Sequence, residues 1–237
     1  MPRYNIYEDE NILVVCNDNS DNYEYLIITF TPLMVKEDTA HQWENGFAEN
    51  MLNSASINNF CFISKWNHWW ELPSFYNAIE KIKKDSLYLN SKRISLYGSS
   101  MGGYGALKSC NILESDYILA IAPQVDIFSS IESRWRPYIS RLRPIGDFPV
   151  IETSIYKGRI DIVYDPLEPD RKHVDITSTK VNKIKAPGTG HFPLKLMQYG
   201  GDLPKKILDI LTERERASHI IDSAISTIIR DVINSKV

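Results

Sequence analysis

The chain has 237 residues, 43% of them hydrophobic and 24% charged, which is the composition of a globular protein that can bury a sizeable core. Its net charge of −3 and its pI near 6.0 argue against a general nucleic-acid-binding protein, because such proteins carry a basic surplus. The three cysteines lie far apart and indicate neither a disulfide framework nor a zinc site. The sequence has no membrane-length apolar run and no signal-peptide pattern, so we expect a cytoplasmic protein.

Apolar runs typical of buried strands alternate with helical patterns along the chain. This alternation predicts an α/β fold with a mostly parallel central sheet flanked by helices. The first strands form a hairpin-like start within residues 5–18. The further expected strands cover residues 23–30, 57–64, 93–99, 117–124, 159–165 and 181–188. The expected helices cover residues 41–54, 72–89, 101–113, 202–216 and 217–236.

We expect a single domain over residues 1–237. Residues 127–157 interrupt the alternation with three prolines and mixed signals, so we expect a small cap-like insertion there. The last expected helix carries a wide apolar stripe, which fits either packing on the sheet or the face of a homodimer. The stripe consists of Ile220, Ile221, Ala224, Ile225, Ile228, Ile229 and Val232.

The sequence Gly98-Ser99-Ser100-Met101-Gly102 follows an expected strand and precedes an expected helix, which is the pattern of a nucleophile elbow. A serine on such a sharp turn projects its Oγ toward a substrate, and the glycines two positions away leave room for it. Ser100 is therefore the candidate nucleophile, and the alternative is an ordinary turn serine. Ser99 is expected to point away. The N–H of Met101, at the start of the helix, can point at a developing oxyanion.

A serine nucleophile needs a base, since its hydroxyl group stays protonated at neutral pH. His191 lies in a glycine-rich loop straight after the last expected strand, where the order serine, acid, histidine places the base. His41 and His219 are expected to have surface, capping or packing roles. His68 lies in an aromatic loop, and His173 follows the candidate acid. No pair of histidines has metal-ligand spacing, so no metal site is predicted.

The acid that orients the base is expected in the loop after the strand at 159–165. Asp165, Glu168 and Asp170 all compete for this role. Asp165 directly precedes a proline and can serve to shape the turn. Asp170 lies at the far side of the loop, from which it can reach back to His191. Asp170 is therefore preferred, with Asp165 as the alternative.

A second oxyanion donor is expected in the loop after the strand at 23–30. Pro32 has no N–H, so the backbone amide of Thr31 or of Leu33 must donate. Thr31 is the predicted donor.

Two aromatic or basic segments are candidates for substrate binding. Trp66, Asn67 and His68 follow an expected strand at the carboxyl edge of the sheet, where ligands bind in open α/β sheets. Arg134 and Arg136 lie in the expected insertion, and guanidinium groups bind carboxylates and phosphates through a bidentate fork. The cluster continues with Trp135, Tyr138, Arg141 and Arg143. It fits an anionic glycan or the phosphates of coenzyme A, and equally a solvated helix face with Trp135 packed inward.

With these residues in place, the chain resembles the α/β-hydrolase superfamily. The resemblance rests on the elbow at residues 98–102, the acid loop with Asp170, the Gly190-His191 pair and the order of strands and helices. The early oxyanion loop differs, because it carries Thr31-Pro32 where many members have a His-Gly pair. Within the superfamily, the segment 98–107 and the Ala-Pro-Gln sequence after the next strand are similar to bacterial capsular-polysaccharide O-acetyltransferases.

The expected function is a serine esterase with a Ser-His-Asp triad, which acts through an acyl-serine on a carbohydrate-linked or small acyl ester and needs no cofactor. The resemblance implies an alternative, in which acetyl-CoA donates the acetyl group to a hydroxyl of a bacterial capsular or other anionic polysaccharide. A non-catalytic binding protein of the same fold is a further alternative. The fold by itself does not choose among them.

Overall fold

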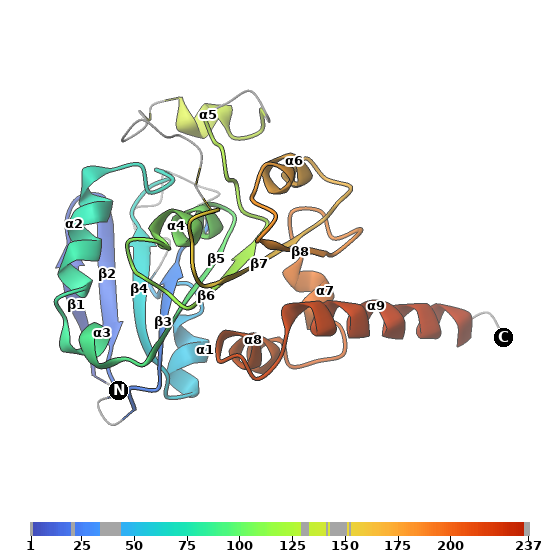
Figure 1. The fold of residues 1–237 in the computed structure, drawn as a ribbon, viewed down its shortest axis with the longest axis horizontal. Helices are drawn as coiled ribbons and strands as arrows, with labels where there is room; N and C mark the ends of the chain where they lie inside the picture. Colours follow the sequence, from blue (N-terminus) through green and yellow to red (C-terminus); the bar gives the residue numbers. More distant parts are fainter. Residues whose placement is uncertain are drawn as a thin grey trace.

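The computed structural model describes residues 2–19, 22–33, 44–128, 133–140, 142, 151 and 153–234. Its centre is an eight-stranded sheet in the order β1-β2-β4-β3-β5-β6-β7-β8 (Figure 1). Strands β1 and β2 are antiparallel to each other, β2 is antiparallel to β4, and the remaining pairs are parallel. The strands are β1 (Arg3–Glu8), β2 (Ile12–Asn17), β3 (Tyr25–Phe30), β4 (Asn58–Ser64), β5 (Arg93–Ser99), β6 (Tyr117–Ile121), β7 (Arg159–Tyr164) and β8 (Asn182–Lys185).

Helices cover both faces of this sheet (Figure 1). Side chains of strand β3 alternate between the two faces of the sheet. Leu26 and Ile28 belong to one hydrophobic cluster and Ile27 to the other. The first cluster includes residues of α2 and α4, and the second includes residues of α1, α7, α8 and α9. The helices are α1 (Glu49–Ser54), α2 (Pro73–Ile82), α3 (Ser86–Asn90), α4 (Met101–Ser109), α5 (Arg136–Ile139), α6 (Asp170–Asp175), α7 (Leu194–Gln198), α8 (Leu203–Leu211) and α9 (Ala217–Asn234). This architecture confirms the predicted mostly parallel α/β sheet.

The helix expected over residues 72–89 is divided into α2 and α3. Asp85 lies between them in an extended conformation, and its side chain accepts a hydrogen bond from the N–H of Leu87 over 2.8 Å. This is an N-cap, which begins a new helix where the periodicity alone suggested one continuous helix. Of the helix expected at 41–54, the structure shows α1, and residues 41–43, which include His41, lie outside the described residues.

The expected insertion at residues 127–157 is described only in part, and Arg141 and Arg143 lie outside the described residues. Its clearest element is α5, in a stretch that we call the α5 segment (residues 133–140). The short helices α6 and α7 were not predicted. They follow β7 and β8, and so lie directly beside the expected acid and base.

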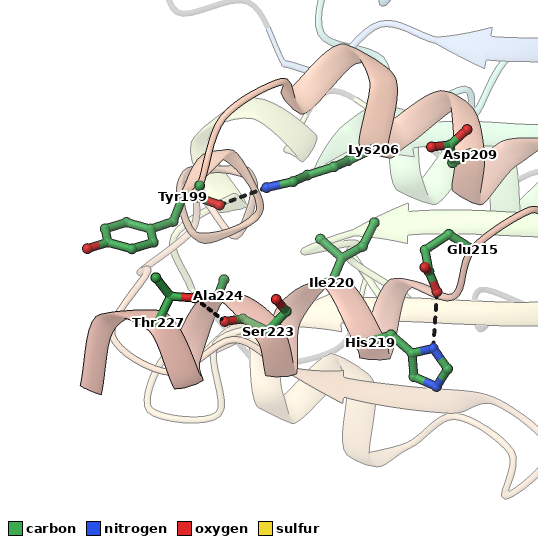
Figure 2. A pocket seen from close by; sticks show the side chains of 10 residues that line it. Tyr199, Lys206, Asp209, Glu215, His219, Ile220, Ser223, Ala224 and Thr227 are labelled. Atoms are coloured by element: carbon green, nitrogen blue, oxygen red, sulfur yellow. Dashed lines mark hydrogen bonds and ion pairs between the residues drawn. The ribbon is translucent and has the colours of Figure 1, made fainter. Parts of the chain in front are cut away.

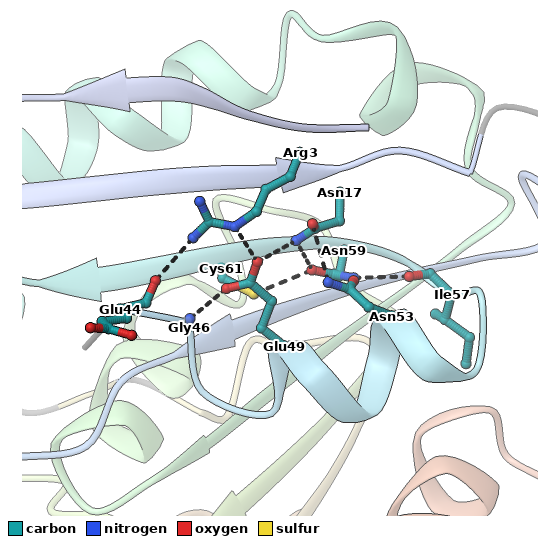
Figure 3. A network of polar contacts seen from close by, with 9 residues as sticks. All are labelled: Arg3, Asn17, Glu44, Gly46, Glu49, Asn53, Ile57, Asn59 and Cys61. Atoms are coloured by element: carbon teal, nitrogen blue, oxygen red, sulfur yellow. Dashed lines mark hydrogen bonds and ion pairs between the residues drawn. The ribbon is translucent and has the colours of Figure 1, made fainter. Parts of the chain in front are cut away.

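A buried polar network joins the antiparallel edge of the sheet to the chain before α1 (Figure 3). The Glu49 carboxylate, 1% exposed, accepts hydrogen bonds from Arg3 Nε at 2.7 Å, Asn17 Nδ2 at 3.0 Å and the N–H of Gly46 at 2.6 Å. Burial acts to raise the pKa of Glu49, but these donors outweigh it and hold the pKa below its ordinary value. The Glu49 carboxylate is therefore a satisfied structural group, and β3 separates the strands of its network from β5, which leads into the elbow.

Helix α9 is buried along only part of its apolar stripe. Ile221 and Ala224 are buried against the second cluster, whereas Ile225 and Ile228 are half-buried and Ile229 is 54% exposed. The side chain of Val232 lies outside the described residues. The predicted packing on the body of the protein therefore holds for the first half of the helix, and a dimer face stays a prediction for the rest. Among the described residues, no helix is long and apolar enough to cross a membrane.

Candidate active site

Ser100 sits on the sharp turn between β5 and α4. Its backbone adopts φ 53° and ψ −120°, a positive-φ conformation that a serine rarely takes, and its N–H donates to the carbonyl of Ile121 in β6 over 2.8 Å. The turn is tightly packed, because a Cβ on Gly98 would lie 2.2 Å from the carbonyl oxygen of Gly102. A Cβ on Gly102 would lie 2.1 Å from the carbonyl oxygen of Phe30. Both positions therefore require glycine, as the elbow pattern predicts.

His191 lies between Ser100 and Asp170. Its Nε2 is 2.8 Å from Ser100 Oγ, and its Nδ1 is 2.7 Å from Asp170 Oδ2. The loop that carries His191 leaves β8 and passes through Gly188 and Gly190, which have φ of +76° and +61°. The structure thus brings together three residues that lie on separate loops at the carboxyl ends of β5, β7 and β8.

Asp170 is the first residue of α6 and is fully buried. Its second oxygen, Oδ1, accepts a hydrogen bond from Arg134 Nη2 over 2.6 Å. Burial acts to raise the pKa of Asp170, but the hydrogen bonds and charges of His191 and Arg134 outweigh it, so the pKa lies below its ordinary value. The carboxylate is therefore ionised at neutral pH and can orient the imidazole through Nδ1.

Asp165, the alternative acid, has different partners. Its Oδ1 accepts a hydrogen bond from the N–H of Leu167 over 2.9 Å, and its Oδ2 accepts one from the N–H of Gly190 over 2.8 Å. Asp165 therefore shapes the turn after β7 and fastens it to the loop that carries His191. Of the two candidates, the geometry brings Asp170, not Asp165, to the imidazole.

The amides expected to form the oxyanion hole differ in availability. Met101 is the first residue of α4, where backbone N–H groups lack a partner within the helix. The N–H of Thr31, by contrast, donates to the carbonyl of Phe62 over 3.1 Å, and its hydroxyl pairs with Ser64 Oγ over 2.9 Å. Thr31 thus extends the pairing of β3 with β4. Its amide is engaged in the sheet, which corrects the prediction that it donates to the oxyanion. Leu33 is the next amide along this loop.

Two of the predicted binding residues in the aromatic loop are packing residues. His68 is fully buried between the rings of Trp66 and Trp70, with centroids 5.1 and 5.0 Å away, and Asn67 is 1% exposed. Burial lowers the pKa of His68 to about 3, so the ring is neutral, and its Nδ1 accepts the N–H of Trp70. Trp66 Nε1 donates to Asn11, in the turn between β1 and β2. The structure therefore assigns this part of the loop to packing rather than to the substrate site.

In the same loop, Trp70 contacts the elbow and Trp69 contacts Gln124, and the sequence revealed neither contact. Trp69 and Trp70 are fully buried and have φ of 46° and 60°. Trp70 Nε1 donates to the carbonyl of Met101 over 2.9 Å and fits against Gly105, where a Cβ would lie 2.6 Å from the indole ring. Trp69 Nε1 donates to Gln124 Oε1 over 3.2 Å. Positive φ at two neighbouring tryptophans is a strained conformation of the kind found at functional sites, and Trp70 braces the elbow directly.

The α5 segment lies over the base. The Trp135 ring is 5.2 Å from that of His191 and 6.0 Å from that of Trp69, between ring centroids. Arg134, predicted to bind substrate, is instead ion-paired with Asp170, so its charge is neutralised. Arg136, the other predicted binding residue, is exposed at the start of α5.

A cavity of about 380 Å³ lies away from these residues, between α9 and the α7–α8 region (Figure 2). Lys206 reaches into this region, but its Nζ donates to the carbonyls of Met197 and Tyr199. His219 pairs with Glu215 at the surface over 3.0 Å. The charged groups of this cavity are thus already partnered, and none of them belongs to the arrangement around Ser100.

Comparison with known proteins supports the fold. No family model and no curated protein sequence matches the chain. Among solved structures, the capsule O-acetyltransferase of Neisseria meningitidis serogroup A in complex with CoA matches with a TM-score of 0.61 and 17% identity, covering 86% of this chain and 93% of that one. The fluorophosphonate-binding serine hydrolase FphF of Staphylococcus aureus matches with a TM-score of 0.56 and 14% identity, over 89% and 97%. A Pyrococcus furiosus esterase matches with a TM-score of 0.54 and 14% identity, covering 85% of this chain and 87% of that one. The chain therefore has the α/β-hydrolase fold, as its sequence predicts.

Proposed function

We propose that the protein is a serine-dependent acyl-ester hydrolase that acts through an acyl-Ser100 intermediate. The observation that carries the proposal is the continuous hydrogen-bonded line from Ser100 Oγ through His191 to Asp170, with distances of 2.8 and 2.7 Å. Its residues have the types, the order and the spacing that nucleophile, base and orienting acid require. Because Asp170 is ionised and accepts from Nδ1, the free nitrogen Nε2 faces Ser100 and can take its proton.

In the first half-reaction, Ser100 Oγ attacks the acyl carbonyl carbon and its proton passes to His191 Nε2. The carbonyl oxygen becomes an oxyanion, which the backbone amides of Met101 and Leu33 would stabilise. The bond to the alcohol then breaks, and the alcohol leaves with the proton from Nε2. In the second half-reaction, water attacks the acyl carbon, gives a proton to Nε2 and releases the acid, while Ser100 regains its proton.

A small or carbohydrate-linked acyl ester is the proposed substrate class. Support comes from the aromatic α5 segment, where Trp135 lies against the His191 ring and Tyr138 packs on Trp69. Aromatic rings suit the apolar faces of sugars, and a substrate that enters beside them would meet the base directly.

The second candidate is an O-acetyltransferase, in which a sugar hydroxyl replaces water. The observation in its favour is the match to the capsule O-acetyltransferase in complex with CoA, with a TM-score of 0.61. In this case acetyl-CoA would acylate Ser100, and its thiol would leave with the proton from His191. Arg134 is not free to bind the phosphates of CoA, because Asp170 neutralises it. Arg136, exposed on α5, is the described arginine of the cluster that fits this role.

The first experiment tests the acyl-serine. The purified protein is mixed with p-nitrophenyl acetate and, separately, with a fluorophosphonate probe. We expect turnover and covalent labelling of the wild type, and neither with S100A. A folded wild type that is never labelled would contradict the proposal and favour the non-catalytic binding protein.

The second experiment separates the two enzyme functions. Acetyl-CoA is supplied with and without a panel of anionic capsular polysaccharides, and free thiol, acetate and acetylated polymer are measured. Acetate formed at the same rate with and without polymer supports the hydrolase. Thiol release that depends on polymer and yields acetylated polymer supports the transferase.

A further inference from the structure

Gln124 reaches the candidate nucleophile from the segment that follows β6. It is fully buried, and its Nε2 lies 3.4 Å from Ser100 Oγ and 3.3 Å from the carbonyl oxygen of Ala122. Its Oε1 lies 3.2 Å from Trp69 Nε1. Gln124 thus contacts the reacting oxygen alongside His191.

The neighbours of Gln124 fix which end of its amide faces Ser100. The indole N–H of Trp69 is only a donor, so it requires the amide oxygen. The carbonyl of Ala122 is only an acceptor, so it requires the NH₂ group. With the amide turned the other way, its NH₂ group would face the N–H of Trp69, and its oxygen would face the carbonyl oxygen of Ala122. Gln124 therefore donates to Ser100 Oγ, and the proton of Ser100 is left to point at His191.

The backbone around Gln124 is held as firmly as its side chain. His173, buried on α6, accepts hydrogen bonds at Nδ1 from the amides of Val125 and Asp126, over 3.3 and 3.4 Å. Trp69 is held in turn by a left-handed backbone and by the ring of Trp135. The donor is thus preorganised at the nucleophile, and no rearrangement is needed when charge develops there.

We propose that Gln124 is a catalytic residue that stabilises Ser100 Oγ as the leaving group of the second half-reaction, an inference that rests on the proposed acyl-Ser100. In that step the bond from the acyl carbon to Oγ breaks, its electron pair stays on Oγ, and Oγ takes a proton from His191 Nε2. Gln124 keeps its own proton and only donates a hydrogen bond to the oxygen as negative charge grows. Trp69 is the positioning residue that keeps the NH₂ group turned toward Oγ.

The effect is expected to differ between the two half-reactions. Before acylation, Oγ belongs to a hydroxyl group that already accepts the hydrogen bond, so the bond gains little strength in the transition state. In the acyl-enzyme, Oγ is an ester oxygen, which is a poor acceptor. The hydrogen bond then strengthens greatly as Oγ becomes charged, and only such differential stabilisation raises a rate. Loss of the donor should therefore slow deacylation more than acylation.

The test compares wild type, Q124M and Q124E in stopped-flow reactions of the full chain with p-nitrophenyl acetate. Methionine keeps the length of the side chain without a donor, and glutamate keeps the acceptor for Trp69 but turns a carboxylate oxygen toward Oγ. For Q124M we expect deacylation to slow by about 10- to 100-fold, the loss of a hydrogen bond to a charged group, and acylation by less than about 3-fold. Q124E should slow deacylation at least as much. Intact-mass spectrometry should show that both variants accumulate the acetylated protein.

W69F provides a second variant that leaves Gln124 in place. It removes the donor that orients the amide, so we again expect deacylation to slow more than acylation, but by a smaller factor than in Q124M. Thermal melting and fluorophosphonate labelling check that each variant is folded, and W69F carries the test if Q124M does not fold. If the ratio of the deacylation rate to the acylation rate stays unchanged in these variants, the role of Gln124 is overturned. A wild type that forms no acyl-enzyme at all would instead overturn the proposed function.

Discussion

Arg134 donates a hydrogen bond to Asp170 over 2.6 Å and forms an ion pair with it, so a residue of the α5 segment holds the same carboxylate that orients His191. Asp170 is fully buried, whereas the side chain of Arg134 remains 32% exposed. Each oxygen of the carboxylate thus has a charged or polar partner, one from the base and one from the α5 segment. The segment is therefore part of the support of the site and not only a cover above it.

Removal of the guanidinium group should weaken this support. We expect R134M to lower kcat/KM by about tenfold or more and to destabilise the protein by about 1–3 kcal/mol, because a buried charge loses a partner. R134K should recover part of both, since it keeps the charge without the fork. R171M is the matched control, because Arg171 pairs with Asp175 at the exposed surface of α6 and such pairs contribute little. Equal effects of R134M and R171M in urea unfolding and ester hydrolysis would contradict this prediction.

The two aspartates of the acid loop should respond differently to replacement by asparagine. D170N should lower kcat by about 10³- to 10⁴-fold, because it favours the wrong tautomer of His191. D165N should lower kcat only a few-fold and reduce stability by about 1 kcal/mol, because Asp165 bonds to the amides of Leu167 and Gly190 and not to the imidazole. Steady-state kinetics with p-nitrophenyl acetate and urea unfolding measure both effects. If D165N were the inactive variant, the role of acid would move to Asp165.

His68 should make the stability of the protein depend on pH. Burial lowers the pKa of His68 to about 3 in the folded protein, whereas an unfolded chain takes up this proton near pH 6.5. Between these values the unfolded state binds more protons, so the contribution is complete above about pH 6.5 and decreases by about 1.4 kcal/mol per pH unit as the pH falls toward 3. H68N, which can still accept the N–H of Trp70, should lack this term. Urea unfolding of both proteins at about pH 7.5 and about pH 5 measures the difference, and identical pH slopes would refute the prediction.

Gly105 should be intolerant of a side chain because Trp70 packs against it. Alanine ordinarily stabilises a helix by about 1 kcal/mol relative to glycine. In α4, however, a Cβ at this position would lie 2.6 Å from the Trp70 ring, which also bonds to the carbonyl of Met101. We expect G105A to destabilise the protein by about 1–3 kcal/mol and to lower kcat through a displaced elbow. The double variant G105A/W70F should lose less than the sum of the single losses, and a neutral or stabilising G105A would show that Trp70 does not brace the elbow.

The sequence predicted the fold and the elbow because both depend on local patterns. Apolar runs indicated the strands, and a serine between glycines after a strand is the common pattern of a nucleophile elbow. His191 could be selected because it follows the last strand, and parallel strands bring their carboxyl ends to one edge. The prediction of the acid was the weakest, because the sequence does not fix the path of the loop after β7. Asp165 and Asp170 are both placed to reach the base, and only the path of the chain into α6 brings one of them to the imidazole.

The roles of Thr31, Trp69, Gln124 and Arg134 were decided by tertiary structure. Whether the Thr31 amide is free depends on its pairing with Phe62, which is 31 residues away along the chain. Trp69 and His68 are neighbours in one loop, yet one contacts Gln124 and the other is closed within the aromatic cluster. No composition or spacing rule separates such neighbours, because their directions follow from backbone conformations that packing imposes.

The sequence by itself thus determined the class of fold, the position of the candidate nucleophile and the region of its base. These follow from local features of the chain, namely apolar runs of strand length, the glycine requirement of a tight turn and the order of elements. The tertiary structure decided which carboxylate faces His191, which side chain donates to Ser100 and which arginine is neutralised. Those relationships depend on directed contacts of about 3 Å between distant segments, and such contacts exist only once the sheet has brought its loops to one edge.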